Sequence, residues 1–250
     1  MRLPSFPVNI ILFSPEEVQL PLPRRDPRAR HILTVLRRQP GDTFDAGIIN
    51  GPRGQATLAA ADRTALRLTF AWGRPPPPLH PLHLLVGLPR PQTARDILRE
   101  ATSLGVAAMH FVRTEKTEAG YAASSLWKTG GWIDCAIAGA AQAFCTRLPA
   151  VTHDLSLAEA IAALPARTGT GAARLALDNY EAPAALAAAN LAGVRSVALA
   201  LGAERGWSAG ERDLLRGAGF TFVHLGARVL RTETACIAAV SLVQARLGWL

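Results

Sequence analysis

Short apolar runs alternate with segments of helical periodicity along the chain from about residue 82 onward. We expect strands at residues 82–88, 107–112, 174–177, 197–201 and 222–225, and helices at 93–103, 124–144, 183–191, 209–216 and 235–245. Alternation of this kind is typical of a parallel sheet whose strands are joined through helices. The pattern therefore predicts an α/β fold for the larger, C-terminal part of the chain.

Closely spaced strands without intervening helices are expected nearer the N-terminus. Residues 43–49, 54–61 and 65–71 have strand character, and turn residues at 50–52 and 62–63 separate them. Such spacing indicates a small β-barrel.

Four consecutive prolines, residues 75–78, separate these two patterns. A proline run favours extended polyproline II geometry and acts as a semi-rigid spacer. We therefore expect a β-barrel domain at residues 1–74, a linker at 75–81 and an α/β domain at 82–250.

The last two predicted helices carry local start signals. Ser208 and Glu211 have the spacing of a capping box, in which each side chain accepts a hydrogen bond from a first-turn amide. Thr232 or Thr234 is expected to cap the final helix, and Glu233 lies where the helix dipole favours a carboxylate. That helix is apolar on nearly every face, which predicts a fully buried element.

Composition excludes several classes of protein. With 250 residues and 49% hydrophobic side chains the chain can form a substantial core, and no apolar run is long enough for a membrane span. The apolar stretch at residues 1–7 is too short for a signal peptide, so a cytoplasmic location is expected. Cys135, Cys145 and Cys236 form no metal-like pair and are interpreted as reduced, buried packing residues. His80 and His83 lack further nearby ligands, so no metal is expected.

Positive charge is concentrated in the first third of the chain. The net charge is +8, and residues 1–74 hold 11 basic but only 6 acidic side chains. Within residues 24–38, six arginines stand against the single Asp26: Arg24, Arg25, Arg28, Arg30, Arg37 and Arg38. Guanidinium groups match phosphate geometry, so this cluster predicts salt-dependent binding to a nucleic-acid backbone. The alternative is an ordinary solvated surface.

Polar, glycine-containing loops follow two of the predicted strands, at residues 201–208 and 225–235. In an open α/β sheet, ligands bind beyond the carboxyl ends of the strands. We therefore expect a ligand site at these two loops. The Thr-Gly-Thr-Gly stretch at residues 168–171 lacks the third glycine of a dinucleotide loop and is interpreted as a flexible connection.

Residues 225–235, Leu-Gly-Ala-Arg-Val-Leu-Arg-Thr-Glu-Thr-Ala, resemble the C-terminal signature of the RsmE-type 16S ribosomal RNA uridine-N3 methyltransferases, members of the SPOUT superfamily. Residues 202–211 are similar to the Gly-Pro-Glu-Gly-Gly-aromatic-Ser-x-x-Glu loop of that family, with Ala203 for proline and Arg205 for glycine. Residues 30–42 are similar to its His-x-x-x-Val-Leu-Arg-x-x-x-Gly-Asp pattern. Weaker similarity covers residues 97–106, 114–116 and 141–149, where Cys145 replaces a usual arginine.

The resemblance implies a C-terminal SPOUT domain with a parallel sheet and a trefoil knot, preceded by a PUA-like β-barrel that helps to hold RNA. It implies methyl transfer from S-adenosyl-L-methionine to N3 of a uridine in 16S rRNA of the small ribosomal subunit. It also implies a homodimer, for which the helical region near Gln142 is a candidate interface.

The same resemblance assigns roles to individual residues. The expected cofactor-binding residues are Leu177, Leu201, Gly202, Gly206, Leu225, Gly226, Leu230, Thr234 and Ala235. Arg231 is expected to stabilise the developing negative charge of uracil, with Arg228 as the alternate and a further RNA contact. Glu204 or Glu233 is expected to accept the N3 proton or to orient Arg231, although Glu233 equally suits a capping role. His31 is expected to contact RNA or, alternatively, to pack or cap locally.

Two other functions remain compatible with the sequence. One is a SPOUT methyltransferase that modifies a different RNA position, which Arg205 and Cys145 leave open. The other is a non-catalytic RNA-binding or ribosome-assembly protein that has lost cofactor binding. Binding of S-adenosyl-L-methionine separates the second from the enzyme, and mapping of the modified base separates the first.

Overall fold

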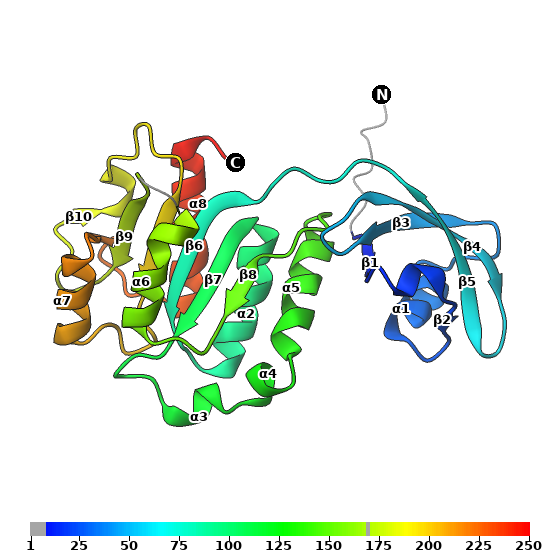
Figure 1. Cartoon of the computed structure of the whole chain (residues 1–250), viewed down its shortest axis with the longest axis horizontal. Helices are drawn as coiled ribbons and strands as arrows, with labels where there is room; N and C mark the ends of the chain where they lie inside the picture. The colour runs from blue at the N-terminus through cyan, green and yellow to red at the C-terminus, as the bar shows by residue number, and fades with distance from the viewer. Residues whose placement is uncertain (1–8, 169–170) are drawn as a thin grey trace. The chain divides into compact units, whose positions relative to one another are not determined.

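The computed structural model describes residues 9–168 and 171–250 (Figure 1). Two expectations concern residues outside these ranges. They are the one for the N-terminal segment 1–7 and, at residues 169–170, the one for the flexible connection at 168–171. The chain divides into two compact units. One contains the described residues up to Pro78 together with Ala140–Leu148, and the other contains Leu79–Gly139 with Pro149–Leu250.

The N-terminal unit is built on a five-stranded sheet in the order β1-β3-β4-β5-β2. Its strands are β1 (Ile11–Phe13), β2 (Leu22–Pro23), β3 (Thr43–Ile48), β4 (Arg53–Ala61) and β5 (Ala65–Trp72). β1 pairs with β3 in parallel, and the remaining pairs are antiparallel. Helix α1 (Pro27–Arg30) continues into a π-helical turn at His31–Val35, and Ala29 and Ile32 join the buried core of this unit.

The segment Ala140–Leu148 is hydrogen-bonded to the N-terminal unit. The Ile10 amide donates to the Ala141 carbonyl at 3.2 Å, and the Thr146 hydroxyl donates to the Gly51 carbonyl at 2.6 Å. The Arg53 guanidinium donates to the Phe144 carbonyl at 3.0 Å. The sequence prediction placed this segment in the second domain, at 82–250. Its partners in the N-terminal unit are distant in the chain, so no local pattern could reveal them.

The C-terminal unit contains a seven-stranded parallel sheet in the order β10-β12-β9-β11-β6-β7-β8. Its strands are β6 (His80–Gly87), β7 (Val106–Val112), β8 (Ala150–Thr152), β9 (Ala173–Leu177), β10 (Ala184–Ala185), β11 (Val197–Leu201) and β12 (Thr221–His224). The α/β class and the parallel sheet expected from the sequence are confirmed.

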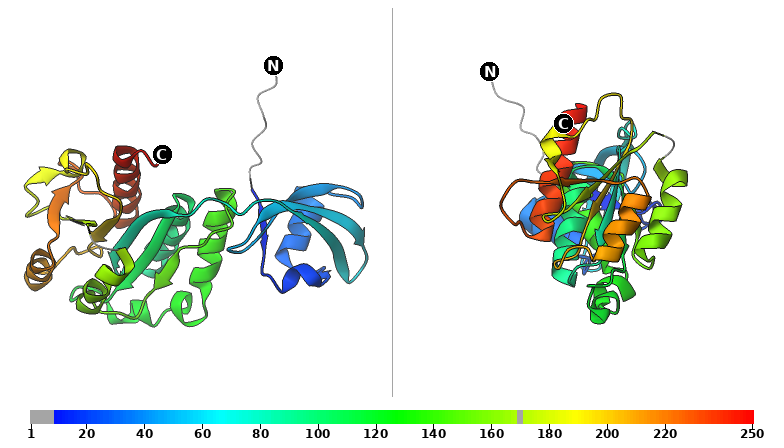
Figure 2. Two further views of the ribbon diagram at one scale, coloured as in Figure 1. Left: turned by 45° about the horizontal axis from the view of Figure 1, so that its top comes forward. Right: turned by 90° about the vertical axis from the view of Figure 1, so that its left-hand side faces the viewer.

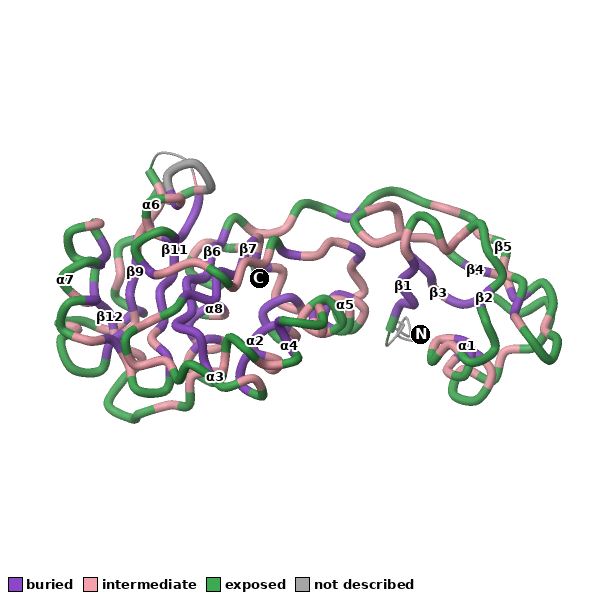
Figure 3. Tube along the Cα trace, turned by 60° about the horizontal axis from the view of Figure 1, so that its bottom comes forward, coloured by how far each residue is buried: buried purple, intermediate pink, exposed green. Residues whose placement is uncertain are grey.

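Helices cover both faces of this sheet (Figures 1 and 2). They are α2 (Pro91–Ser103), α3 (Ala119–Ala122), α4 (Ser125–Lys128), α5 (Gly131–Gln142), α6 (Leu157–Thr168), α7 (Ala209–Gly217) and α8 (Thr232–Leu247). Alternate residues of β6 point to opposite faces, as strand geometry requires. Leu84 and Val86 pack with α2 and α8, whereas Leu85 packs with α6 and α7. Figure 3 shows the buried positions concentrated in the central strands.

Two helix predictions were wrong. The predicted helix at 124–144 is broken into α4 and α5 at Gly130, whose φ of +77° is left-handed and ends a helix. The predicted helix at 183–191 is instead the short strand β10 followed by a 3-10 turn at Leu186–Ala188. The sheet determines this outcome, because β10 pairs with β12 and satisfies backbone groups that a helix would satisfy internally. Strand β8 and helix α6 were not predicted.

The final helix also differs from expectation. Arg231, not a threonine, occupies the N-cap position of α8, and no side-chain cap is formed. Only Cys236, Ala239, Val240, Val243 and Gln244 are buried, and Leu242 keeps 36% of its surface exposed. Alanines make α8 apolar on nearly every face of its sequence pattern. Packing against α2 and the sheet nevertheless buries only one face of the helix. Within the described ranges no helix has the length and apolarity needed to cross a membrane.

Candidate functional site

A cavity of about 180 Å³ lies at the carboxyl ends of three adjacent strands, β12, β9 and β11. Each strand ends at the cavity: Leu177 closes β9, Leu201 closes β11 and His224 closes β12. Parallel pairing places these ends at the same edge of the sheet, where backbone groups are free to bind a ligand. A cavity therefore lies where the two loops predict a ligand site.

The loop after β11, residues 202–207, forms one wall of the cavity and is called the glycine loop below. A Cβ atom at Gly202 would lie 2.8 Å from the Cα of Gly206 and 2.9 Å from its carbonyl carbon. Gly206 itself has a φ of +64°, in the left-handed region that favours glycine. The loop therefore folds back on itself at a distance that only glycine allows.

Side chains distant in sequence hold the glycine loop in place. The Lys116 ammonium donates to the carbonyls of Trp207 at 2.7 Å and Arg205 at 3.1 Å. Glu211 is buried and accepts hydrogen bonds from the Ser208 amide at 2.8 Å and the Glu115 amide at 2.8 Å. The Ser208 hydroxyl accepts from the Glu211 amide at 3.1 Å, which confirms the predicted capping box. Hydrogen bonds to charged groups are the stronger class, so this wall is rigid.

Trp207 and Asp178 form the floor of the cavity with the end of β9. The Trp207 ring is fully buried, and its indole N–H donates to the Leu177 carbonyl at 3.1 Å. Asp178 is 6% exposed and pairs with Arg212 at 2.8 Å. Its other oxygen accepts the backbone N–H of Tyr180 at 2.7 Å, which fixes the turn after β9.

A second wall is formed by the segment 225–231, called the arginine segment below. Its residues Leu225, Arg228, Val229 and Leu230 line the cavity. Arg228 is exposed and Val229 keeps 81% of its surface exposed. The Gly226 amide donates to Nδ1 of His224 at 3.0 Å. That bond places the proton of a neutral His224 ring on Nε2.

The cavity brings together most of the predicted cofactor residues. Those that line it are Leu177, Leu201, Gly202, Gly206, Leu225, Leu230 and Ala235, together with the predicted Glu204 and Arg228. Gly226, Arg231, Glu233 and Thr234 belong to the same stretch of chain but are not among the lining residues. Arg231 is exposed at the N-cap of α8, and Glu233 lies in the first helical turn.

Several lining residues were missed by the sequence analysis. They are Asp178, Asn179, Tyr180, Ala203, Arg205, Trp207, His224, Val229 and Thr232. The polar run 178–180 directly follows a predicted strand, so the same strand-end argument applied to β9 would have found it.

Glu204 is held by a backbone amide from another loop. It is exposed, and its Oε1 accepts the Arg90 amide at 2.9 Å, at the start of α2. This hydrogen bond ties the glycine loop to the loop after β6. It also orients the Glu204 carboxylate at the cavity wall.

The N-terminal arginines fall into two groups. Arg24, Arg25 and Arg30 are exposed and line a hollow of about 390 Å³ with Pro27, Leu33 and Thr34. Arg28 is instead enclosed, because it donates to Glu17, to Asp26 and to the Leu12 carbonyl. Its hydrogen bonds lower the pKa of both the Glu17 and the Asp26 carboxyl groups. Arg37 is exposed, and His31 and Arg38 are half-buried.

The cysteines and histidines lie apart from the cavity loops, His224 excepted. In the part of the chain that the structure describes, no group of three or more His, Cys, Asp or Glu side chains is placed to hold a metal ion. Cys236 is buried as expected, and burial raises the pKa of its thiol to about 12. Cys135 and Cys145 are free thiols but only half-buried, so full burial was wrong for these two.

Residues 75–244 match the family model of the RNA methyltransferase domain, so the chain contains a domain of this class. At the level of individual relatives, the chain is 38% identical to ribosomal RNA small subunit methyltransferase E of Treponema pallidum, over 95% of this chain and 91% of that protein. It is 27% identical to ribosomal RNA small subunit methyltransferase E 1 of Borreliella burgdorferi, over 96% and 99%. The chain belongs to the ribosomal RNA small subunit methyltransferase E family.

A solved structure supports the fold. Ribosomal RNA small subunit methyltransferase E from Neisseria gonorrhoeae, bound to S-adenosyl methionine, superposes with a TM-score of 0.70 at 22% identity. The match covers 95% of this chain and 98% of that chain. The two proteins therefore share the same fold over nearly their whole length.

Proposed function

We propose that this protein transfers a methyl group from S-adenosyl-L-methionine to N3 of a uridine in 16S rRNA of the small ribosomal subunit. The observation that carries the proposal is the cavity at the ends of β9, β11 and β12, walled by the glycine loop and the arginine segment. Membership of the methyltransferase E family, together with a relative solved with S-adenosyl methionine, supports the choice of cofactor and of RNA class.

The cavity suits an adenosine-bearing cofactor. Leu177, Leu201, Leu225, Leu230 and Ala235 supply apolar surface for a planar base. Gly202 and Gly206 pack against each other and both line the cavity, so a ligand can contact loop backbone that carries no side chain there. When bound, S-adenosyl-L-methionine supplies an electrophilic methyl group on its sulfonium. Gly226 and Thr234, which do not line the cavity, remain predicted contacts.

Negative charge on uracil must be stabilised as N3 loses its proton. A guanidinium aimed at a uracil carbonyl oxygen provides that stabilisation. Arg228 lines the cavity, and Arg231 lies three residues further on at the start of α8. We propose that Arg231 has the catalytic role, with Arg228 as the alternate. Because Arg228 lines the cavity itself, we also propose that it contacts the RNA.

The N3 proton requires an acceptor or a route to solvent. Glu204 lines the cavity, and the Arg90 amide orients its carboxylate. We assign Glu204 as the first candidate for this role. Glu233 is assigned second, because its position in the first turn of α8 also suits stabilisation of the helix dipole.

RNA binding is assigned to the exposed arginines of the N-terminal unit. Arg24, Arg25 and Arg30 line one hollow, and Arg37, Arg38 and His31 follow on the same short stretch of chain. The enclosed Arg28 has a structural environment, so we propose that it supports this surface instead of contacting RNA directly.

Matched variants test this division of roles. Alanine at Arg24, Arg25 and Arg30 should weaken RNA binding and lower the salt slope by about one for each phosphate that is no longer neutralised. Arg28→Ala should instead reduce stability above pH ~4. The Arg28 hydrogen bonds depress the pKa of Glu17 and Asp26, so their stabilisation is present above the ordinary carboxyl pKa and is lost as the pH falls. An unchanged salt slope in the triple variant would mean that the arginines are ordinary surface.

The finer architectural assignments are also proposals. We propose that the C-terminal unit forms a trefoil knot and that the N-terminal sheet is a PUA-like barrel. We further propose a cytoplasmic homodimer. The region near Gln142, which is exposed at the end of α5, stays the predicted interface. The half-exposed apolar face of α8, including Leu242, is a second candidate because a second copy would bury it.

Methyl transfer to small ribosomal subunits that lack the modification tests the proposed function. Labelled S-adenosyl-L-methionine reports transfer, and reverse transcription locates the product because an N3 methyl blocks the pairing edge of uracil. One new stop in 16S rRNA is expected. Labelling without that stop would indicate another RNA position or atom. Absence of both labelling and cofactor binding would indicate a non-catalytic RNA-binding protein.

A further inference from the structure

Tyr180 is an exposed aromatic ring at the edge of the cavity. It lines the cavity and yet keeps 82% of its surface exposed. A single exposed aromatic side chain is ordinary on a protein surface, so the informative feature of Tyr180 is its position at the edge of the cavity, where a ligand can contact the ring.

The Tyr180 ring is supported from one side. The Cζ atom of Arg212 lies 5.5 Å from the ring centroid, in cation–π geometry. Arg212 is itself fixed by Asp178 at 2.8 Å, in a pair whose side chains are only 11% and 2% exposed. The Tyr180 amide also donates to Asp178. The ring is therefore held at a defined position, with its remaining surface open to solvent.

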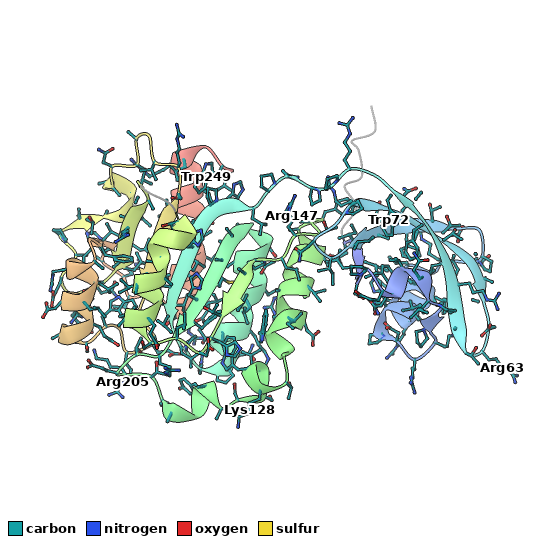
Figure 4. The ribbon with its side chains drawn as sticks, viewed as in Figure 1. Arg63, Trp72, Lys128, Arg147, Arg205 and Trp249 are labelled. Carbon is teal, nitrogen blue, oxygen red and sulfur yellow. The ribbon has the colours of Figure 1, made fainter. Side chains whose placement is uncertain are left out.

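Arg205 provides a free positive charge on the same cavity. It is exposed and lines the cavity, as Arg228 does on the second wall. Within residues 9–168 and 171–250, neither guanidinium forms an ion pair with a carboxylate. The backbone of Arg205 is nevertheless fixed, because its carbonyl accepts a hydrogen bond from Lys116 at 3.1 Å. Figure 4 shows Arg205 at the surface of the unit, in the loop that leads into α7.

We propose that Tyr180 and Arg205 form a landing site for one nucleotide of the RNA substrate, with the base stacked on Tyr180 and a flanking phosphate on Arg205. The inference rests on the proposed function and names residues that contact its substrate. Unpaired RNA bases are bound by stacking on aromatic side chains, and guanidinium groups bind phosphate. An enzyme that modifies the pairing edge acts on an unpaired or flipped-out base, so a surface that holds such a base suits it.

The experiment measures kcat, the KM for small ribosomal subunits and the Kd for S-adenosyl-L-methionine on five proteins. These are the wild type, Tyr180→Ala, Tyr180→Phe, Arg205→Ala and the control Arg195→Ala. Arg195 is an exposed arginine that precedes β11, at the opposite end of the strand that leads to Arg205. The RNA measurements are repeated over a salt series.

Tyr180→Ala should raise the KM for RNA about tenfold, because it removes one stacking contact between a base and an aromatic ring. Tyr180→Phe retains the ring and should keep the wild-type KM. Arg205→Ala should raise the KM for RNA several-fold and lower the salt slope by about one, as removal of one guanidinium–phosphate pair requires. Arg195→Ala should match the wild type. The Kd for S-adenosyl-L-methionine should stay unchanged in all variants.

The outcomes separate this inference from the proposed function. Wild-type turnover with an unchanged KM for RNA in both Tyr180→Ala and Arg205→Ala would overturn the inference alone. A weaker cofactor Kd with an unchanged KM for RNA would also overturn it, because the ring and guanidinium would then hold the adenine and carboxylate of the cofactor. A wild-type protein that transfers no methyl group would contradict the proposed function and this inference together.

Discussion

The two walls of the cavity differ in how firmly the rest of the protein holds them. The glycine loop is fastened by Lys116 and by the Arg90 amide, which lie about ninety residues or more away in the chain, and the adjoining Glu211 accepts a hydrogen bond from the equally distant Glu115 amide. Among the described residues, the arginine segment is held by far fewer hydrogen bonds, chiefly the bond from Gly226 to His224. Its side chains Arg228 and Val229 are exposed.

This difference suggests a division of labour between the walls. A wall that is already ordered loses little conformational entropy when a small ligand binds, so the glycine loop suits the cofactor. Exposed guanidinium groups on a less constrained wall suit a large anionic partner that arrives from solvent. We therefore expect loss of the contacts that fasten the glycine-loop backbone to affect cofactor affinity. Changes in the arginine segment, like removal of the exposed Arg205 side chain, should instead affect RNA binding or turnover.

The largest expected effect comes from the arginine segment. Arg228→Ala and Arg231→Ala each remove a candidate for stabilising the uracil anion, and loss of one such group lowers kcat about 10²- to 10³-fold. The variant with the larger loss identifies the catalytic arginine. Single-turnover methyl transfer measures this step, and cofactor affinity should stay near the wild-type value. A loss confined to cofactor affinity would break the comparison between the walls.

Lys116→Ala should have the next largest effect. It removes a charged donor from the carbonyls of Trp207 and Arg205, so the glycine loop should loosen and the Kd for S-adenosyl-L-methionine should rise about tenfold. Lys116→Arg retains the charge and donors and should restore most of the affinity. Calorimetric titration measures both. Equal affinity in Lys116→Ala and the wild type would show that the loop is ordered without this hydrogen bond.

Trp207→Phe should have the smallest effect. It keeps a buried aromatic ring but removes the hydrogen bond to the Leu177 carbonyl and the volume of the second ring, which together cost about 2 kcal/mol of unfolding free energy. Urea denaturation measures the change, and cofactor affinity should weaken only slightly. A stability equal to that of the wild type would show that the indole N–H does not contribute to holding the loop against β9.

The glycine loop also shows which features the sequence was able to predict. The strand at Val197–Leu201 and the capping box of Ser208 and Glu211 are local, since each depends on residues a few positions apart. Lys116 and Arg90 were not predicted as partners of this loop. Their hydrogen bonds join residues 89 to 114 positions apart, and only the folded sheet brings them together.

Tertiary context explains the helix errors in the same way. The apolar, alanine-rich stretch at 183–191 suits a helix locally, yet pairing of Ala184–Ala185 with β12 gives a strand. Gly130, by contrast, is a local signal for a helix end, and the prediction of one continuous helix at 124–144 did not use it. For α8, hydrophobicity predicted burial on every face, but only packing against α2 and the sheet decides which face is covered.

The most direct test of the account measures methyl transfer to small ribosomal subunits and S-adenosyl-L-methionine affinity side by side in Lys116→Ala and Arg231→Ala. The account predicts opposite patterns. Lys116→Ala should weaken cofactor binding and recover turnover at saturating cofactor, whereas Arg231→Ala should bind the cofactor normally and remain slow. The same pattern of loss in both variants would contradict a cavity with one wall for the cofactor and the other for RNA.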